Sequence, residues 1–151
     1  MAKRYALTGQ ATTAASATLP LMTVMGATTA RPKIYDIIVG SAATPADNAA
    51  KFQIQRCTTA GTAGSALTPQ ALDAADPASV VTSGLAIFSV GPTLTANAFL
   101  LQWSQNQRAT FRWVAAPGSE LVIPATAANG LALMSPSGAA IAYDITIEFE
   151  E

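Results

Sequence analysis

The stretch of sequence that decides the fold is Ile141-Ala142-Tyr143-Asp144-Ile145-Thr146-Ile147-Glu148-Phe149-Glu150. Large apolar side chains occupy every second position, and polar or small side chains occupy the positions between them. Because the side chains of a strand point alternately to the two faces of its sheet, this pattern predicts a strand with one buried face and one polar face. Such strands are typical of antiparallel sheets in β-sandwiches.

Shorter strand-like segments precede this one. They are residues 34–39, 52–56, 99–103, 108–115, 121–123 and 131–134. Gly, Pro, Asn and Asp between these segments predict turns. Ala116-Pro117-Gly118-Ser119 has Pro and Gly in the two central positions of a turn, and Asn129-Gly130 predicts a tight hairpin.

Two segments carry weaker signals. Residues 58–84 are expected to be a long connection, in which residues 70–75 could form one helical turn. Residues 1–30 are rich in Ala and Thr and contain one apolar patch, which includes Leu19, Leu21 and Met22. Part of this segment is expected to be a first strand and part an arm that orders against a partner, and a frayed terminus is the alternative.

We therefore predict an all-β protein, an antiparallel β-sandwich of jelly-roll-like type with an extended N-terminal arm. The arm and its first strand are expected in residues 1–30, and the sandwich domain in residues 31–151. No sequence repeat at a fixed period is found, which excludes solenoids and propellers.

The composition is unusually poor in charge. Only 11% of the 151 residues are charged and the net charge is −1, whereas an average soluble domain has about 25% charged residues. A chain without a basic surplus is not expected to bind nucleic acid or an acidic membrane surface. The long uncharged windows contain Pro, Gly, Asn, Gln and Thr, so none is expected to span a membrane as a helix.

The residues that most catalytic sites need are scarce. The chain has no His and a single Cys, Cys57, which excludes a Ser–His–Asp triad and an intrachain disulfide. Asp47 with Asn48, and Asp73 with Asp76, lack the spacing of a calcium loop and are better explained as turns. We therefore expect no catalytic residue, no metal site, no cofactor and no enzymatic activity.

The most conspicuous aromatic residues are Trp103, Phe111 and Trp113. Phe111 and Trp113 share an apolar strand face with two alanines, which favours core packing or a subunit interface over a sugar-stacking platform. Arg108 and Arg112 lie on the opposite face of that strand. They are expected to pair with acids of a neighbouring subunit or to face solvent.

The lack of charge itself indicates assembly. Charged residues normally cover much of a free surface, and here small and uncharged residues, including 33 Ala and 18 Thr, must do so. Interfaces are depleted in charge, so we expect a structural protein that works in an assembly. The expected interface residues are Leu19, Leu21, Met22, Trp103, Arg108, Phe111, Arg112 and Trp113.

Several segments also resemble a known family. They are residues 34–48 (IYDIIVGSAATPADN), 106–118 (NQRATFRWVAAPG), 120–127 (ELVIPATA) and 129–131 (NGL). These segments resemble small virion structural proteins of tailed bacteriophages, of the head decoration (cement) type. The resemblance covers residues 32–150.

This resemblance implies a non-enzymatic β-sandwich subunit, often a homotrimer, on the outer surface of a phage capsid. It implies that the protein is made in the host cytoplasm and braces neighbouring subunits of the major capsid protein. Two alternatives remain open. One is a tail or head-fibre component, and the other is a carbohydrate-binding β-sandwich module in which Trp103 or Trp113 stacks on a sugar.

Overall fold

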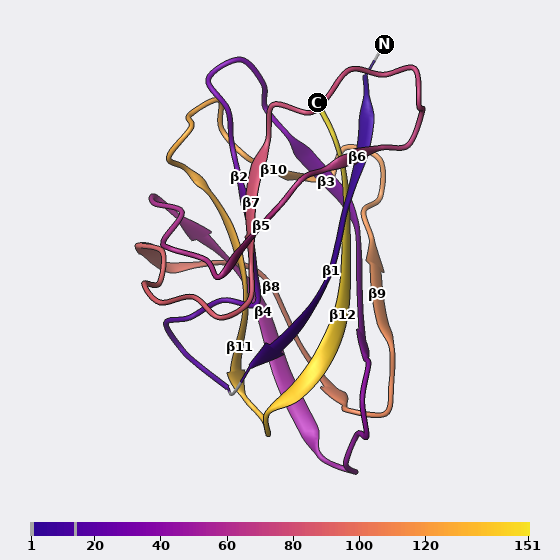
Figure 1. Ribbon diagram of the computed structural model, residues 1–151, viewed down its shortest axis with the longest axis vertical. Coiled ribbons are helices and arrows are strands. Elements are labelled where there is room, and N and C mark those ends of the chain that lie inside the picture. The colour runs from indigo at the N-terminus through magenta and orange to yellow at the C-terminus, as the bar shows by residue number, and fades with distance from the viewer. Residues whose placement is uncertain (1, 14) are drawn as a thin grey trace.

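The structure is a computed structural model that describes residues 2–13 and 15–151. The described residues form twelve strands and no helix. The strands make two antiparallel sheets, which we call sheet I and sheet II (Figure 1). The chain is therefore an all-β sandwich, which confirms the fold class predicted from the sequence.

Sheet I combines strands from both ends of the chain. Its order is β6-β1-β12-β3, and both β9 and β10 pair with the remaining edge of β3. In Figure 1 the indigo strand β1 and the yellow strand β12 lie side by side, with Arg4 opposite Glu150 and Gln10 opposite Asp144. The strands are β1 (Arg4–Thr13), β3 (Lys33–Ser41), β6 (Gln70–Ala71), β9 (Phe111–Val114), β10 (Leu121–Val122) and β12 (Ile141–Glu150).

Sheet II has the order β5-β7-β2-β11-β4-β8. Its strands are β2 (Met22–Met25), β4 (Ala49–Cys57), β5 (Ser65–Leu67), β7 (Thr82–Leu85), β8 (Leu94–Asn106) and β11 (Gly130–Ser137). Short strands form one edge of this sheet, and the 13-residue strand β8 forms the other.

Strand β12 has the burial that its sequence predicts. Its large apolar side chains, from Ile141 to Phe149, are 0–7% exposed and belong to the core between the sheets. Tyr5 of β1 stacks on Phe149, with ring centroids 5.6 Å apart. Burying one large apolar side chain contributes about 1.5–3 kcal/mol, so the alternation in β12 is a major source of folding free energy.

Residues 1–30 do not form a separate arm in the described structure. Strand β1 lies between β12 and β6, and β2 lies between β7 and β11. The expected first strand is present, but it is a central strand of sheet I because Tyr5, Leu7 and Ala11 are buried in the core. The boundary expected at residue 30 thus falls inside the sandwich. Met1 and Ala14 lie outside the described residues.

The connection expected over residues 58–84 contains three short strands, β5, β6 and β7. The helical turn considered for residues 70–75 does not form, because Gln70 and Ala71 pair with β1. A turn follows instead, in which the carboxylate of Asp73 accepts a hydrogen bond from the backbone N–H of Ala75 (3.0 Å).

Of the two turns singled out, one is confirmed and one is wrong. Gly118 has a φ of +84°, and the N–H of Ser119 donates to the carbonyl of Ala116 (2.8 Å), as a type II turn requires. Asn129-Gly130 makes no hairpin, since β10 and β11 belong to different sheets. Gly130 begins β11 at a position where an added Cβ would lie 2.4 Å from the carbonyl oxygen of Val24.

Candidate functional site

Three aromatic rings close the sandwich where the ends of the two sheets meet at β8 and β9. Trp103 of β8 stacks on Phe52 of β4, with ring centroids 5.3 Å apart, and on Phe111 of β9, with centroids 4.2 Å apart. Phe52 also makes an edge-to-face contact with Tyr143 at 5.0 Å. The rings therefore join sheet II to sheet I, as the alternation around Phe111 and the apolar run at Trp103 permit.

This stacking leaves little ring surface for a sugar. Trp103 is half-buried between two phenyl rings, and its Nε1–H donates to Oε1 of Gln105 (3.1 Å). Trp113 is also half-buried and packs against the core. The structure thus places both tryptophans in packing roles, which is the interpretation that the sequence favoured over a stacking platform.

The two arginines of this region differ in their surroundings. Arg112 donates through Nε to both carboxylate oxygens of Asp36 on β3, at 3.2 and 3.1 Å. Its acid is thus in the same chain, and the pairing expected with a neighbouring subunit is wrong for this residue. Arg108 is exposed, and no ion pair within residues 2–13 and 15–151 includes it.

Two of the three residues of the N-terminal apolar patch that were expected at an interface lie in the core. Leu21 and Met22 are fully buried in the core of their own chain, so they cannot contact a neighbouring subunit. Met22 begins β2, which lies between β7 and β11 in sheet II. Its side chain belongs to the core. Leu19 is half-buried in the connection before that strand.

The outer face of sheet I carries ion pairs formed within the chain. Lys33 Nζ lies 3.0 Å from Oε1 of Glu150, its register partner on β12. The guanidinium of Arg4 lies 5.9 Å from the centroid of the Tyr35 ring, a cation–π contact. Burial, followed by the charge of Glu148, raises the pKa of Tyr35 to about 12. These charges stabilise one another within the chain.

The outer face of sheet II is different, because it carries a row of amides. Gln53 and Gln55 of β4 are only 7% and 6% exposed. Gln102 of β8 donates to Gln53 (3.2 Å), Gln53 donates to Gln55 (3.3 Å), and Gln55 donates to the carbonyl of Thr95 (2.9 Å). This amide row crosses from β4 to β8 and reaches the edge of the sheet.

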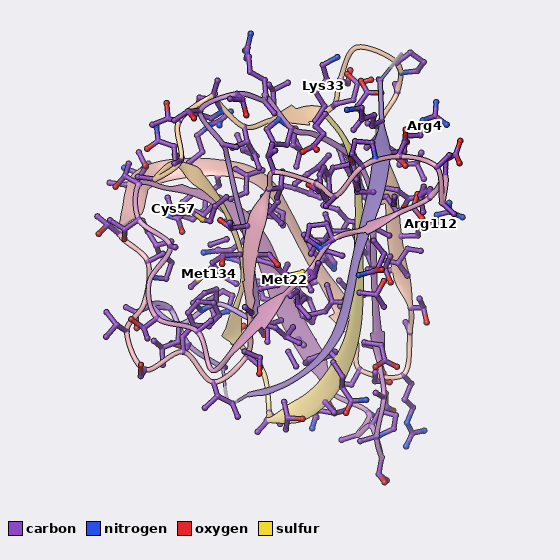
Figure 2. The ribbon with its side chains drawn as sticks, turned by 45° about the horizontal axis from the view of Figure 1, so that its top comes forward. Arg4, Met22, Lys33, Cys57, Arg112 and Met134 are labelled. Carbon is purple, nitrogen blue, oxygen red and sulfur yellow. The ribbon has the colours of Figure 1, made fainter. Side chains whose placement is uncertain are left out.

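A small sulfur-rich cluster lies beside the amide row. Cys57, Met25, Ala132 and Met134 are 0–2% exposed, and the thiol of Cys57 lies 4.0 Å from the Met25 sulfur. Figure 2 shows Cys57 and Met134 on the opposite side of the molecule from Arg112. Burial raises the pKa of the Cys57 thiol to about 11, so this thiol is a poor nucleophile at neutral pH.

The edge strand β8 is the longest open element of the molecule. Apart from pairing with β4, the backbone of residues 96–105 makes no hydrogen bond with any other described residue. No Lys, Arg, Asp, Glu or Pro occurs in residues 94–106. Neither this edge nor the amide row was predicted from the sequence, although the Gln-x-Gln spacing of β4 and the long uncharged run were visible signals.

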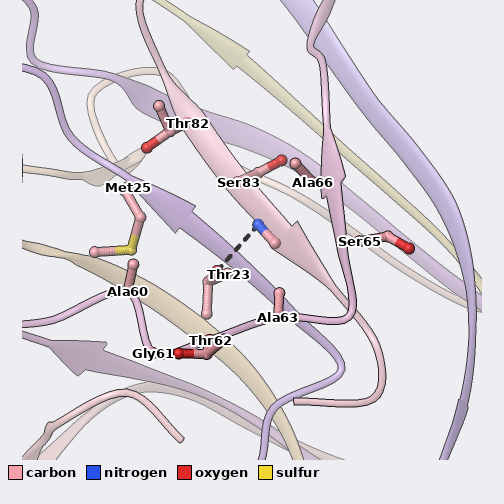
Figure 3. A pocket seen from close by; sticks show the side chains of 11 residues that line it. Thr23, Met25, Ala60, Gly61, Thr62, Ala63, Ser65, Ala66, Thr82 and Ser83 are labelled. Carbon is pink, nitrogen blue, oxygen red and sulfur yellow. Dashed lines mark hydrogen bonds between the residues drawn. The ribbon is translucent and has the colours of Figure 1, made fainter. Parts of the chain in front are cut away.

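Two cavities of the described structure differ in size and lining. One, of about 320 Å³, lies between residues 60–66 and the strands β2 and β7 (Figure 3). It is lined by uncharged residues, which apart from Met25 are Ala, Gly, Ser and Thr. Within this lining the N–H of Gly84 donates to the hydroxyl of Thr23 (3.2 Å). The other, of about 710 Å³, lies beside residues 2–4 and residues 72–76, and neither contains Ser or Cys next to a base.

In the same described part of the chain, no three His, Cys, Asp or Glu side chains are grouped so that they could hold a metal ion. No helix among the described residues is long and apolar enough to cross a membrane.

Comparison with protein-family models, with curated proteins and with solved structures finds no match to this chain. Strand β8 and the three glutamines of the amide row carry no charge of their own.

Proposed function

We propose that this chain is a non-enzymatic capsid decoration (cement) protein, which binds the outside of a tailed-phage head and braces neighbouring major capsid subunits. The observation that carries the proposal is the open edge strand β8, which carries no charged residue over residues 94–106 and pairs on one side only. Surfaces of this kind are typical of proteins that are completed by neighbours. The resemblance of residues 32–150 to head decoration proteins supports a phage capsid as the assembly to which this chain binds.

The order of the strands supports this proposal. Strands β1-β12-β3-β9 of sheet I face strands β2-β11-β4-β8 of sheet II. This order, in which neighbouring strands are distant in sequence, supports the jelly-roll type expected from the sequence, a fold found in viral capsid subunits and lectins. The half-buried, stacked state of Trp103 argues for the capsid role over the lectin role.

The mechanism of such a protein is mechanical. One copy that contacts two capsid subunits buries surface on both, and each apolar Å² removed from water contributes roughly 25 cal/mol. Because the protein binds the intact shell and not its separated subunits, this binding free energy opposes rupture of the shell. The protein is made in the host cytoplasm and acts on the virion.

The direct test uses phage heads that lack the protein. Purified protein is added back, free protein is removed by sedimentation, and heads with and without it are heated at low salt. We expect the protein to sediment with the heads and to raise the temperature at which DNA is released. Absence from the head pellet, or an unchanged release temperature, would overturn the proposal, as would location on the tail or a fibre by electron microscopy.

A further inference from the structure

We infer that the open edge of β8 pairs with the same edge of a second copy of this chain, so that two copies of sheet II become one continuous sheet. This inference goes beyond the proposed function and does not depend on it. It follows from the geometry of the edge, from its lack of protection and from its self-complementarity.

The edge is regular over Leu101–Asn106. In this stretch β8 keeps an unbroken antiparallel register with β4, from Ile54 opposite Leu101 to Ala49 opposite Asn106. The register shifts lie at Gln55 and beyond, toward the start of β8. The carbonyl of Asn106 accepts from the N–H of Ala109 (2.9 Å), but the other side of residues 101–105 makes no backbone hydrogen bond with the described residues, so its N–H and C=O groups are available to another strand.

The other sheet edges are protected and β8 is not. Natural sheets protect an open edge with charged residues or Pro, or by keeping the edge strand very short. The edge strands β5, β6, β9 and β10 have only two to four residues. Strand β8 has 13 residues and carries neither charge nor Pro. A long edge without these features is an efficient template for pairing.

The edge also complements itself. In antiparallel pairing centred on Ser104, Gln102 of one copy lies opposite Asn106 of the other, on the outer face. Gln102 already uses its NH₂ group to donate to Gln53. Its carbonyl oxygen can therefore accept from the Asn106 amide of the second copy, which donates one N–H to Asp47 and has a second N–H to offer. The amide row then extends from one copy into the other, and such side-chain amide ladders stabilise paired strands. Residues 94–106 carry no charge, and the charged residue beside the axis in each copy is Lys51 of β4, the register partner of Ser104.

Identical edges paired in this way are related by a two-fold axis. The inferred assembly is therefore a dimer of two 15.4 kDa chains, in contrast to the homotrimer that the resemblance implies. The mass of the protein in solution distinguishes this dimer from a trimer.

The first experiment measures mass by sedimentation equilibrium. We expect wild type to have twice the mass of one chain, and Ser104→Lys to weaken self-association by about tenfold or more, since two lysines would face each other at the axis. The control, Ser65→Lys, adds the same charge at an exposed position on the opposite edge, and should leave the dimer intact. A wild-type monomer or trimer, or an unchanged Ser104→Lys dimer, would overturn the inference.

The second experiment does not depend on an added charge. Strand partners at the axis bring their Cα atoms to about 4.5–5.5 Å, a distance that a disulfide can bridge. Under mild oxidation Ser104→Cys should form a covalent dimer, whereas Ser65→Cys should not, and buried Cys57 should not compete. Equal cross-linking of the two variants would refute the pairing. A monomer that still binds phage heads would overturn the dimer alone, and a dimer that does not bind them would overturn the proposed function alone.

Discussion

The guanidinium of Arg112 on β9 lies against both carboxylate oxygens of Asp36 on β3, with Nε 3.1 Å from Oδ2. The side chain of Asp36 is only 5% exposed, whereas that of Arg112 is 62% exposed. A buried carboxylate is thus neutralised by a surface cation from the neighbouring strand. Removing the arginine leaves a buried charge without its counterion, which destabilises a protein more than the loss of an exposed pair.

We therefore expect Arg112→Ala to lower the thermal midpoint by about 5 °C. The matched control is Arg108→Ala, which removes an exposed arginine four residues away and should change the midpoint by less than about 1 °C. Calorimetry of wild type and both variants at pH 7 measures the two changes in thermal midpoint. If both variants lowered the midpoint equally, the Arg112–Asp36 pair would contribute no more to stability than an unpaired surface arginine does.

The sequence allowed some of these features to be predicted and not others. The strand at residues 141–150 and the turn at Gly118 are local patterns, so they were found correctly. The Asp36–Arg112 pair joins residues 76 positions apart, and it exists only because β9 pairs with β3. Periodicity shows that two residues share a face, but it does not show which strands are neighbours.

The burial of Gln53 and Gln55 was missed for a related reason. Alternation assigns polar residues to the solvent side of a sheet, but on this face the two amides of β4 are 7% and 6% exposed. They satisfy one another and Gln102 of the neighbouring strand, a solution that only the tertiary structure reveals.

The second prediction concerns Cys57. Because this thiol is 2% exposed and its pKa is raised to about 11, it should not react with Ellman's reagent at pH 8 in the native protein, and it should react completely in denaturant. Ser65→Cys supplies the control, since its exposed thiol should react at once. Rapid modification of Cys57 in native wild type, with the circular dichroism spectrum unchanged, would contradict the burial described above.

The third prediction concerns the three tyrosines. Burial raises the pKa of each above the ordinary value of 10.0, and that of Tyr35 to about 12. The folded chain therefore holds these protons at pH values at which the unfolded chain releases them, and the free energy of unfolding falls as the pH rises above 10.

Absorbance at 295 nm should show no tyrosine ionising near pH 10 in the folded protein, and all three ionising there in urea. Tyr35→Phe should make the decline in stability between pH 10 and pH 12 less steep. Release of all three protons near pH 10 from a chain that is still folded would contradict the prediction.

The last prediction compares two buried tyrosines that differ in their hydrogen bonds. Tyr5 is 0% and Tyr143 1% exposed, but the hydroxyl of Tyr5 donates to the carbonyl of Pro77 (3.0 Å), whereas that of Tyr143 has no partner among the described residues. A buried hydroxyl without a partner loses its hydrogen bonds to water on folding, and no hydrogen bond within the protein compensates for that free-energy cost. Tyr143→Phe should therefore leave the free energy of unfolding unchanged or raise it, and Tyr5→Phe should lower it by about 1 kcal/mol. Urea unfolding with equal m-values measures both, and a larger loss in Tyr143→Phe than in Tyr5→Phe would show that the Tyr143 hydroxyl is satisfied after all.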